Sequence, residues 1–135
     1  EIIEVNKLGY QRALMQTRQG NIEAFIKFFL QCVIDQCGNY IRKLEIIKKI
    51  YREDMEAIKV IGGSTIYRIV PLMMKEVVFT KKYIEEQTGV SKNTLTKNIN
   101  RLIELGILED ISKGRYKEYR YKRIYEVFIG NSLYY

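Results

Sequence analysis

The sequence predicts a mainly α-helical protein in which an N-terminal helical segment precedes a winged helix-turn-helix with a small antiparallel β wing. Three observations predict this fold. Two capped helices meet at Gly89, short β-prone segments lie on either side of them, and a basic turn separates the last two segments. We place the helical segment at residues 1–61 and the winged helix-turn-helix at residues 62–135, with Gly62-Gly63 as the hinge between them.

The helix-turn-helix is indicated by its caps and its turn. Thr80 and Ser91 can each begin a helix, because a hydroxyl oxygen accepts hydrogen bonds from the unpaired amides of a first helical turn. Gly89 stands where the first helix must reverse, a position that often needs a positive φ. The turn is therefore only about three residues long, as this motif requires.

The second helix of the motif has an apolar side and a polar side. Leu95, Ile99 and Leu102 fall on the apolar side. The residues that we predict to contact DNA in the major groove are polar or basic: Ser91, Lys92, Asn93, Thr96, Lys97 and Asn100. Asparagine can bond adenine edges, and lysine and threonine can reach guanine or phosphate. The alternative is that these residues are only the solvated face of an amphipathic helix, or a face that contacts protein.

The wing is predicted from two strands at residues 107–111 and 116–121, joined by a turn, with residues 77–79 as a third strand. The wing residues that we predict to lie along DNA phosphates are Lys113, Arg115 and Lys117. A charged hairpin tip that only prevents aggregation is the alternative. Tyr116, Tyr119 and Tyr121 are expected on the packed side of the ribbon rather than as a platform for bases.

The N-terminal segment is predicted to be helical from Leu8 to about Arg18 and again after a cap at Asn21. The second run repeats apolar residues at helical spacing and predicts a face covered from water: Ile22, Phe25, Ile26, Phe29, Leu30, Val33 and Ile34. The pattern continues beyond Gly38 with Tyr40, Leu44, Ile47, Tyr51, Met55 and Ile58. One long helix and two helices broken at Gly38 both remain open. The spacing also fits either packing within the subunit or a short dimer seam.

Further along, Pro71 predicts a kink or a break in a helix at residues 65–75.

The formal net charge of +7 favours an anionic partner, with nucleic acid first and a membrane surface second. Most of the excess lies near the predicted wing, since residues 112–123 hold six Lys and Arg against one Glu. The chain has no histidine, which excludes imidazole bases and most zinc sites within it. We therefore predict no catalytic, cofactor-binding or metal-binding residue, and we expect a cytoplasmic protein without a membrane span.

The run Arg18 to Leu30, RQGNIEAFIKFFL, resembles the segment that follows the catalytic core in many bacterial Fic family proteins. In those proteins the sequence of this segment is usually close to R-x-G-D-W-x-x-W-I-x-F-F-L. This sequence keeps the arginine, the glycine, the isoleucine and Phe-Phe-Leu, while Asn21, Ile22 and Phe25 replace the aspartate and both tryptophans. The order of parts is also similar, because in that family the helix leads to a C-terminal winged helix.

The resemblance implies a parent that transfers AMP from ATP to protein hydroxyls, using a histidine in an H-P-F-x-D-G-N-G-R loop. That loop is absent from this sequence. We therefore expect a C-terminal accessory part that is inactive by itself, with ATP and Mg²⁺ needed only by the absent catalytic core. Two functions remain open. The first is a DNA-binding module for targeting or transcriptional regulation, with duplex DNA and a second copy as the expected partners. The second is a protein-interaction or dimerisation module that presents targets to the Fic catalytic domain.

Overall fold

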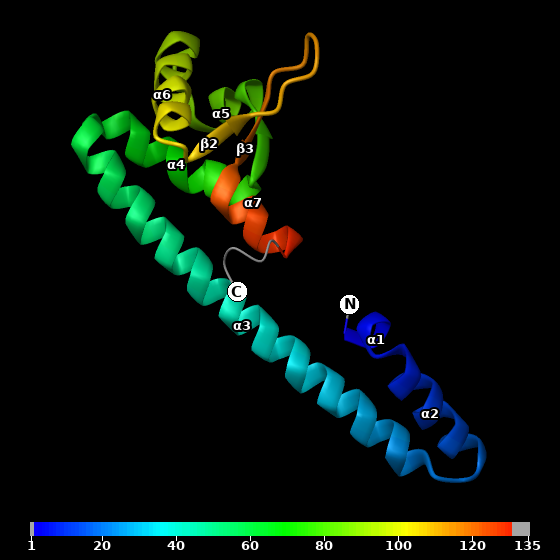
Figure 1. The fold of residues 1–135 in the computed structure, drawn as a ribbon. Helices are drawn as coiled ribbons and strands as arrows, with labels where there is room; N and C mark the ends of the chain where they lie inside the picture. The colour runs from blue at the N-terminus through cyan, green and yellow to red at the C-terminus, as the bar shows by residue number, and fades with distance from the viewer. Residues whose placement is uncertain (1, 131–135) are drawn as a thin grey trace. The chain divides into compact units, whose positions relative to one another are not determined.

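The computed structural model describes residues 2–130 (Figure 1). Glu1 of the first predicted segment and residues 131–135 of the second lie outside the described residues. It confirms the predicted fold class, a mainly helical chain with a small antiparallel sheet. The elements in chain order are α1 (Ile2–Val5), α2 (Lys7–Arg18), α3 (Ile22–Ile61), α4 (Ser64–Glu76), β1 (Val78–Thr80), α5 (Lys81–Thr88), α6 (Lys92–Glu104), β2 (Leu108–Asp110), β3 (Glu118–Tyr121) and α7 (Lys122–Ile129). No helix within the described residues is both long enough and apolar enough to span a membrane.

The chain forms two compact units, residues 1–45 and residues 46–135. The division lies inside α3, upstream of the predicted boundary at residues 61 and 62. The second unit begins this early because Ile50 and Ile58, both on α3, are buried in its core.

α3 is one helix of 40 residues that continues through Gly38, which answers the question that the sequence left open. Asn21 caps it as predicted, since its Oδ1 accepts a hydrogen bond from the Ala24 amide at 3.2 Å. A glycine inside a helix costs only about 1 kcal/mol relative to alanine, so the residues on either side can keep the helix intact.

In the first unit, the ring of Tyr10 on α2 contacts two rings of α3. Its centroid lies 6.1 Å from that of Phe25 and 6.4 Å from that of Phe28. Gly9 allows this close approach, because a Cβ added there would lie 2.8 Å from Cε2 of Phe28. These contacts cover only one side of α3.

The predicted covered face of α3 is wrong in its extent. Phe25 is half-buried, but the other members of the run are exposed within the described residues: Ile22, Ile26, Phe29, Leu30, Val33 and Ile34. The periodicity identified an apolar face, and the ring contacts with α2 involve Phe25 of this face and Phe28 beside it.

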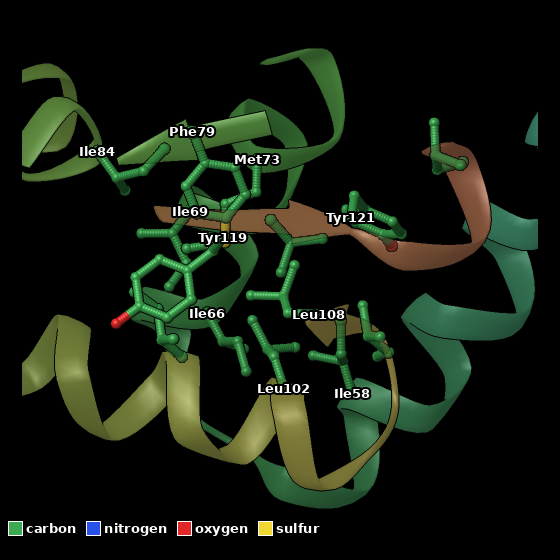
Figure 2. Close-up of a cluster of buried hydrophobic side chains, with 14 of the residues drawn as sticks. Ile58, Ile66, Ile69, Met73, Phe79, Ile84, Leu102, Leu108, Tyr119 and Tyr121 are labelled. Atoms are coloured by element: carbon green, nitrogen blue, oxygen red, sulfur yellow. The ribbon is translucent and has the colours of Figure 1, made fainter. Parts of the chain in front are cut away.

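In the second unit, four helices (α4, α5, α6 and α7) and the end of α3 contribute to one side-chain core that also includes the sheet (Figure 2). The strand order is β1-β3-β2, with both pairs antiparallel and Phe79 opposite Tyr119.

Pro71 lies inside α4 without ending it, so of the two predicted outcomes, a kink or a break, the break did not occur. The later part of the α3 pattern packs within the subunit, since Ile47 and Met55 contact this core and Ile58 is fully buried.

A polar network within this unit joins α3 to β3 and α7. Asp54 on α3 is buried, and its Oδ2 accepts a hydrogen bond from the Tyr121 hydroxyl at 2.9 Å. Its other oxygen accepts a bond from Nη1 of Arg123 at 2.8 Å, and Arg123 also pairs with Glu53. Burial, followed by the charge of Asp54, raises the pKa of Tyr121 above its ordinary value, so this tyrosine stays a hydrogen-bond donor.

Candidate nucleic-acid interface

The predicted helix-turn-helix is formed by α5 and α6. Oγ1 of Thr80 accepts a hydrogen bond from the Tyr83 amide at 3.2 Å, and Oγ of Ser91 accepts one from the Thr94 amide at 3.4 Å. Gly89 ends α5 in the left-handed region, with φ of 66°. Both predicted caps and the predicted turn are therefore confirmed.

α6 is held by its apolar side and leaves most of its polar side open. Leu95, Ile99 and Leu102 are buried, together with Asn98. The predicted contact residues that are exposed on α6 and its cap are Ser91, Lys92, Asn93, Lys97 and Asn100. An exposed polar face on a helix can lie in the major groove of a duplex.

Thr96 differs from the other predicted contact residues on α6 because it is partly buried and its hydroxyl is engaged twice. The hydroxyl donates to the backbone oxygen of Lys92 at 2.7 Å and accepts a hydrogen bond from Nζ of Lys81. Lys81 lies in the first turn of α5, so this bond joins the two helices of the motif beside their exposed surface.

The wing is the hairpin between β2 and β3, and Figure 1 shows its loop extending past the end of the sheet. Ser112 closes its base, since Oγ accepts from the Glu118 amide at 3.1 Å and the Ser112 amide donates to Oδ1 of Asp110 at 2.9 Å. Hydrogen bonds from the side chain and backbone of Ser112 lower the pKa of Asp110. The three predicted phosphate contacts of the wing, Lys113, Arg115 and Lys117, are all exposed.

A groove of about 590 Å³ lies between the wing tip and the first turns of α5 and α6. Its lining residues come from all three elements: Thr80, Lys81, Lys82, Glu85, Lys92, Arg115, Tyr116 and Lys117. Five of them are basic and one is acidic. We call this feature the basic groove.

The basic groove brings together three of the predicted residues, Lys92, Arg115 and Lys117. The remaining predicted residues do not line it: Ser91, Asn93, Thr96, Lys97, Asn100 and Lys113. The predicted site did not include the other five lining residues, Thr80, Lys81, Lys82, Glu85 and Tyr116. For Lys81, Lys82 and Glu85 the available signal was their position after the Thr80 cap, in the first turns of the helix that precedes α6.

The tyrosines of the wing divide between two environments. Tyr119 and Tyr121 are buried in the core, as predicted, whereas Tyr116 is 83% exposed and lines the basic groove. The prediction for Tyr116 is therefore wrong. Side chains alternate along a strand, so a residue three positions before Tyr119 cannot share its face, and Tyr116 also precedes β3.

Searches against models of protein families and against curated proteins found no match to this chain.

Proposed function

We propose that this chain is a winged-helix module that binds duplex DNA. The observation that supports the proposal best is the basic groove, because five basic side chains from three separate elements line it beside the exposed polar side of α6. Phosphate contacts supply most of the affinity of such proteins for DNA, and cations that converge from several elements fit a regular phosphate backbone.

In this proposal α6 enters the major groove. Asn93, Lys97 and Asn100 contact base edges, while Ser91 and Lys92 contact the backbone beside them. Thr96 acts through its bond to Lys81, which it holds near the phosphates. The wing follows the backbone through Lys113, Arg115 and Lys117.

We further propose that the module belongs to a Fic-type protein that transfers AMP, on the basis of the resemblance at residues 18–30. In that case the parent carries the catalytic histidine loop, with its ATP and Mg²⁺, in the catalytic domain. The module then directs the parent in the cytoplasm to a DNA site, or lets it regulate transcription. This chain contributes no catalytic residue to the reaction in this proposal.

A salt titration tests DNA binding. If about six phosphates are neutralised, the logarithm of the affinity should fall against the logarithm of the salt concentration with a slope near −5. Replacing Lys97 and Arg115 by alanine should weaken binding at least tenfold and make the slope shallower by about 1, because Arg115 contacts phosphate and Lys97 contacts a base edge. The Lys27→Ala variant, which removes one exposed charge from α3, serves as the control. Unchanged affinity in the double variant would refute the proposal.

A second candidate function, self-association, is favoured by an exposed apolar stripe along the first half of α3. The stripe repeats with spacings of four, four and three residues: Ile22, Ile26, Leu30, Val33, Cys37, Ile41 and Leu44. All seven side chains are exposed. A repeat of 11 residues is close to the period of a straight α-helix, so the stripe stays on one side and suits another helix packed along it.

The area of the stripe is consistent with a second copy as its occupant. Side chains of this size, each about half exposed, leave on the order of 600 Å² uncovered, which is at the upper end for a monomer. Two such surfaces would bury about 1,200 Å² together, the lower limit for a stable specific interface. A dimer would also suit a module that reads a two-fold DNA site.

Sedimentation equilibrium tests this candidate. The chain should form dimers, and Ile26→Glu with Ile41→Glu should dissociate them by placing charges in the seam. Val60→Glu is the matched control, because Val60 lies on the same helix, is 89% exposed and is outside the stripe. A chain that is monomeric at all concentrations would exclude the stripe as a seam between copies.

A further inference from the structure

The basic groove contains two features that contact with a duplex backbone does not explain. One is the exposed ring of Tyr116, and the other is the carboxylate of Glu85. A surface that binds only phosphate gains little from an aromatic ring and is weakened by a negative charge. Both groups have a use if the ligand in the groove also carries a base and a sugar.

The ring of Tyr116 is available for stacking. The wing residues Tyr119 and Tyr121 lie in the paired strand and are buried, whereas Tyr116 precedes this strand and keeps 83% of its surface exposed. Its backbone is held in a tight turn, since Lys113 and Tyr116 form an isolated bridge around Gly114. Stacking of a base on an aromatic side chain stabilises single-stranded complexes without requiring a particular sequence.

The charges around the ring match the other parts of a nucleotide. Arg115 and Lys117 flank Tyr116 in the sequence, and Lys81, Lys82 and Lys92 line the groove from the helices. These cations suit phosphate groups. Glu85 is partly buried and can accept hydrogen bonds from a base amino group or a sugar hydroxyl.

The size of the groove agrees with a ligand of this kind. Its volume of about 590 Å³ lies within the range of small-ligand sites, roughly 300–1,000 Å³. In continuous duplex DNA the bases are stacked and paired, so their faces cannot reach Tyr116. A base at a single-stranded end or flap has a free face.

We propose that the basic groove binds one unpaired nucleotide, with its base stacked on Tyr116, the phosphates on either side of it among the five basic residues, and Glu85 accepting a hydrogen bond from an amino group of the base. This inference rests on the proposed DNA-binding function. It makes the preferred substrate a duplex that ends in a short single strand, with α6 on the duplex and the wing tip on the unpaired nucleotide.

Fluorescence anisotropy with two labelled duplexes of the same paired sequence tests the inference, one blunt and one with an overhang of three nucleotides. The overhang should bind roughly tenfold more tightly. Tyr116→Ala should remove this preference, so that the blunt and overhang duplexes bind equally, and Tyr116→Phe should keep it, because phenylalanine retains the ring. Tyr40→Ala is the control for loss of an exposed tyrosine elsewhere, since Tyr40 is 54% exposed on α3. Unchanged thermal melting of the variants would show that they fold.

The outcomes separate this inference from the proposed function. Equal binding of blunt and overhang duplexes, with no effect of Tyr116→Ala, would overturn the nucleotide site and leave duplex binding intact. Absence of binding to either duplex would overturn both. A competition with free AMP distinguishes the source of the nucleotide: displacement of the overhang only at millimolar AMP supports an unpaired nucleotide of DNA, whereas displacement at micromolar AMP would overturn that assignment in favour of a free mononucleotide.

Discussion

The two compact units differ in what they do with their apolar side chains. In the second unit the side chains of Ile58, Leu102 and Tyr121 are less than 2% exposed, and the exposed surface of α6 is mainly polar. In the first unit the apolar stripe of α3 is uncovered, with Ile22 at 62% and Leu44 at 63% exposure. The second unit therefore has the closed core of an independent domain, while the first presents a surface suited to another helix.

The contrast occurs along a single helix with nearly constant periodicity. Ile41 and Ile58 both lie on α3, yet Ile41 is 57% exposed and Ile58 is fully buried. The hydrophobic pattern is the same kind of signal in both places. Such a pattern therefore identifies a face that can be buried, whereas the partner that buries it is set by the rest of the fold.

The largest expected effect is on the closed core. Ile58→Ala should lower the free energy of unfolding by about 2–5 kcal/mol, because it removes buried methyl groups and leaves a cavity. Ile41→Ala should change it by only about 0.5 kcal/mol or less. Urea unfolding measures both. A comparable loss for Ile41→Ala would contradict an open stripe and show that another surface covers it in solution.

The next effect concerns the polar network that joins α3 to the sheet. Asp54→Ala should destabilise the second unit by about 3 kcal/mol, since the Tyr121 hydroxyl and the Arg123 guanidinium each lose an acceptor in or near the core. Thermal unfolding followed by circular dichroism measures the change. Glu53→Ala is the matched control, because Glu53 contacts the same arginine from an exposed position and should have little effect. An equal loss of stability in both variants would mean that the burial of Asp54 does not determine how much the network stabilises the second unit.

The smallest effect is a pH dependence at the base of the wing. Hydrogen bonds from Ser112 place the pKa of Asp110 below its ordinary value of 3.8 in the folded chain. A lowered pKa means that this stabilisation is complete above the ordinary value and is lost as the pH falls through the folded value. Asp110→Asn should therefore remove a small part of the acid sensitivity of the wing, measured by amide hydrogen exchange at Ser112 between about pH 5 and pH 2. An identical pH profile in both proteins would contradict a role for the carboxylate.

Local chemistry made much of the second unit predictable. The caps at Thr80 and Ser91, the turn at Gly89 and the three strands each depend on residues within a few positions of one another. The candidate site was only partly predictable. Lys97 and Asn100 were found from the helical period, but Lys81 and Glu85 line the basic groove only because α5, α6 and the wing meet there.

By itself, the sequence determined the helices, their caps, the basic wing and the apolar faces, because these follow from backbone preferences and from the spacing of side chains along one segment. The tertiary structure alone decided that Tyr116 is exposed, that Asp54 is buried against Tyr121, and that the first half of α3 keeps its stripe open. The physical reason is that burial is a property of pairs of surfaces. A residue's neighbours in the chain do not specify which distant segment, if any, will cover it.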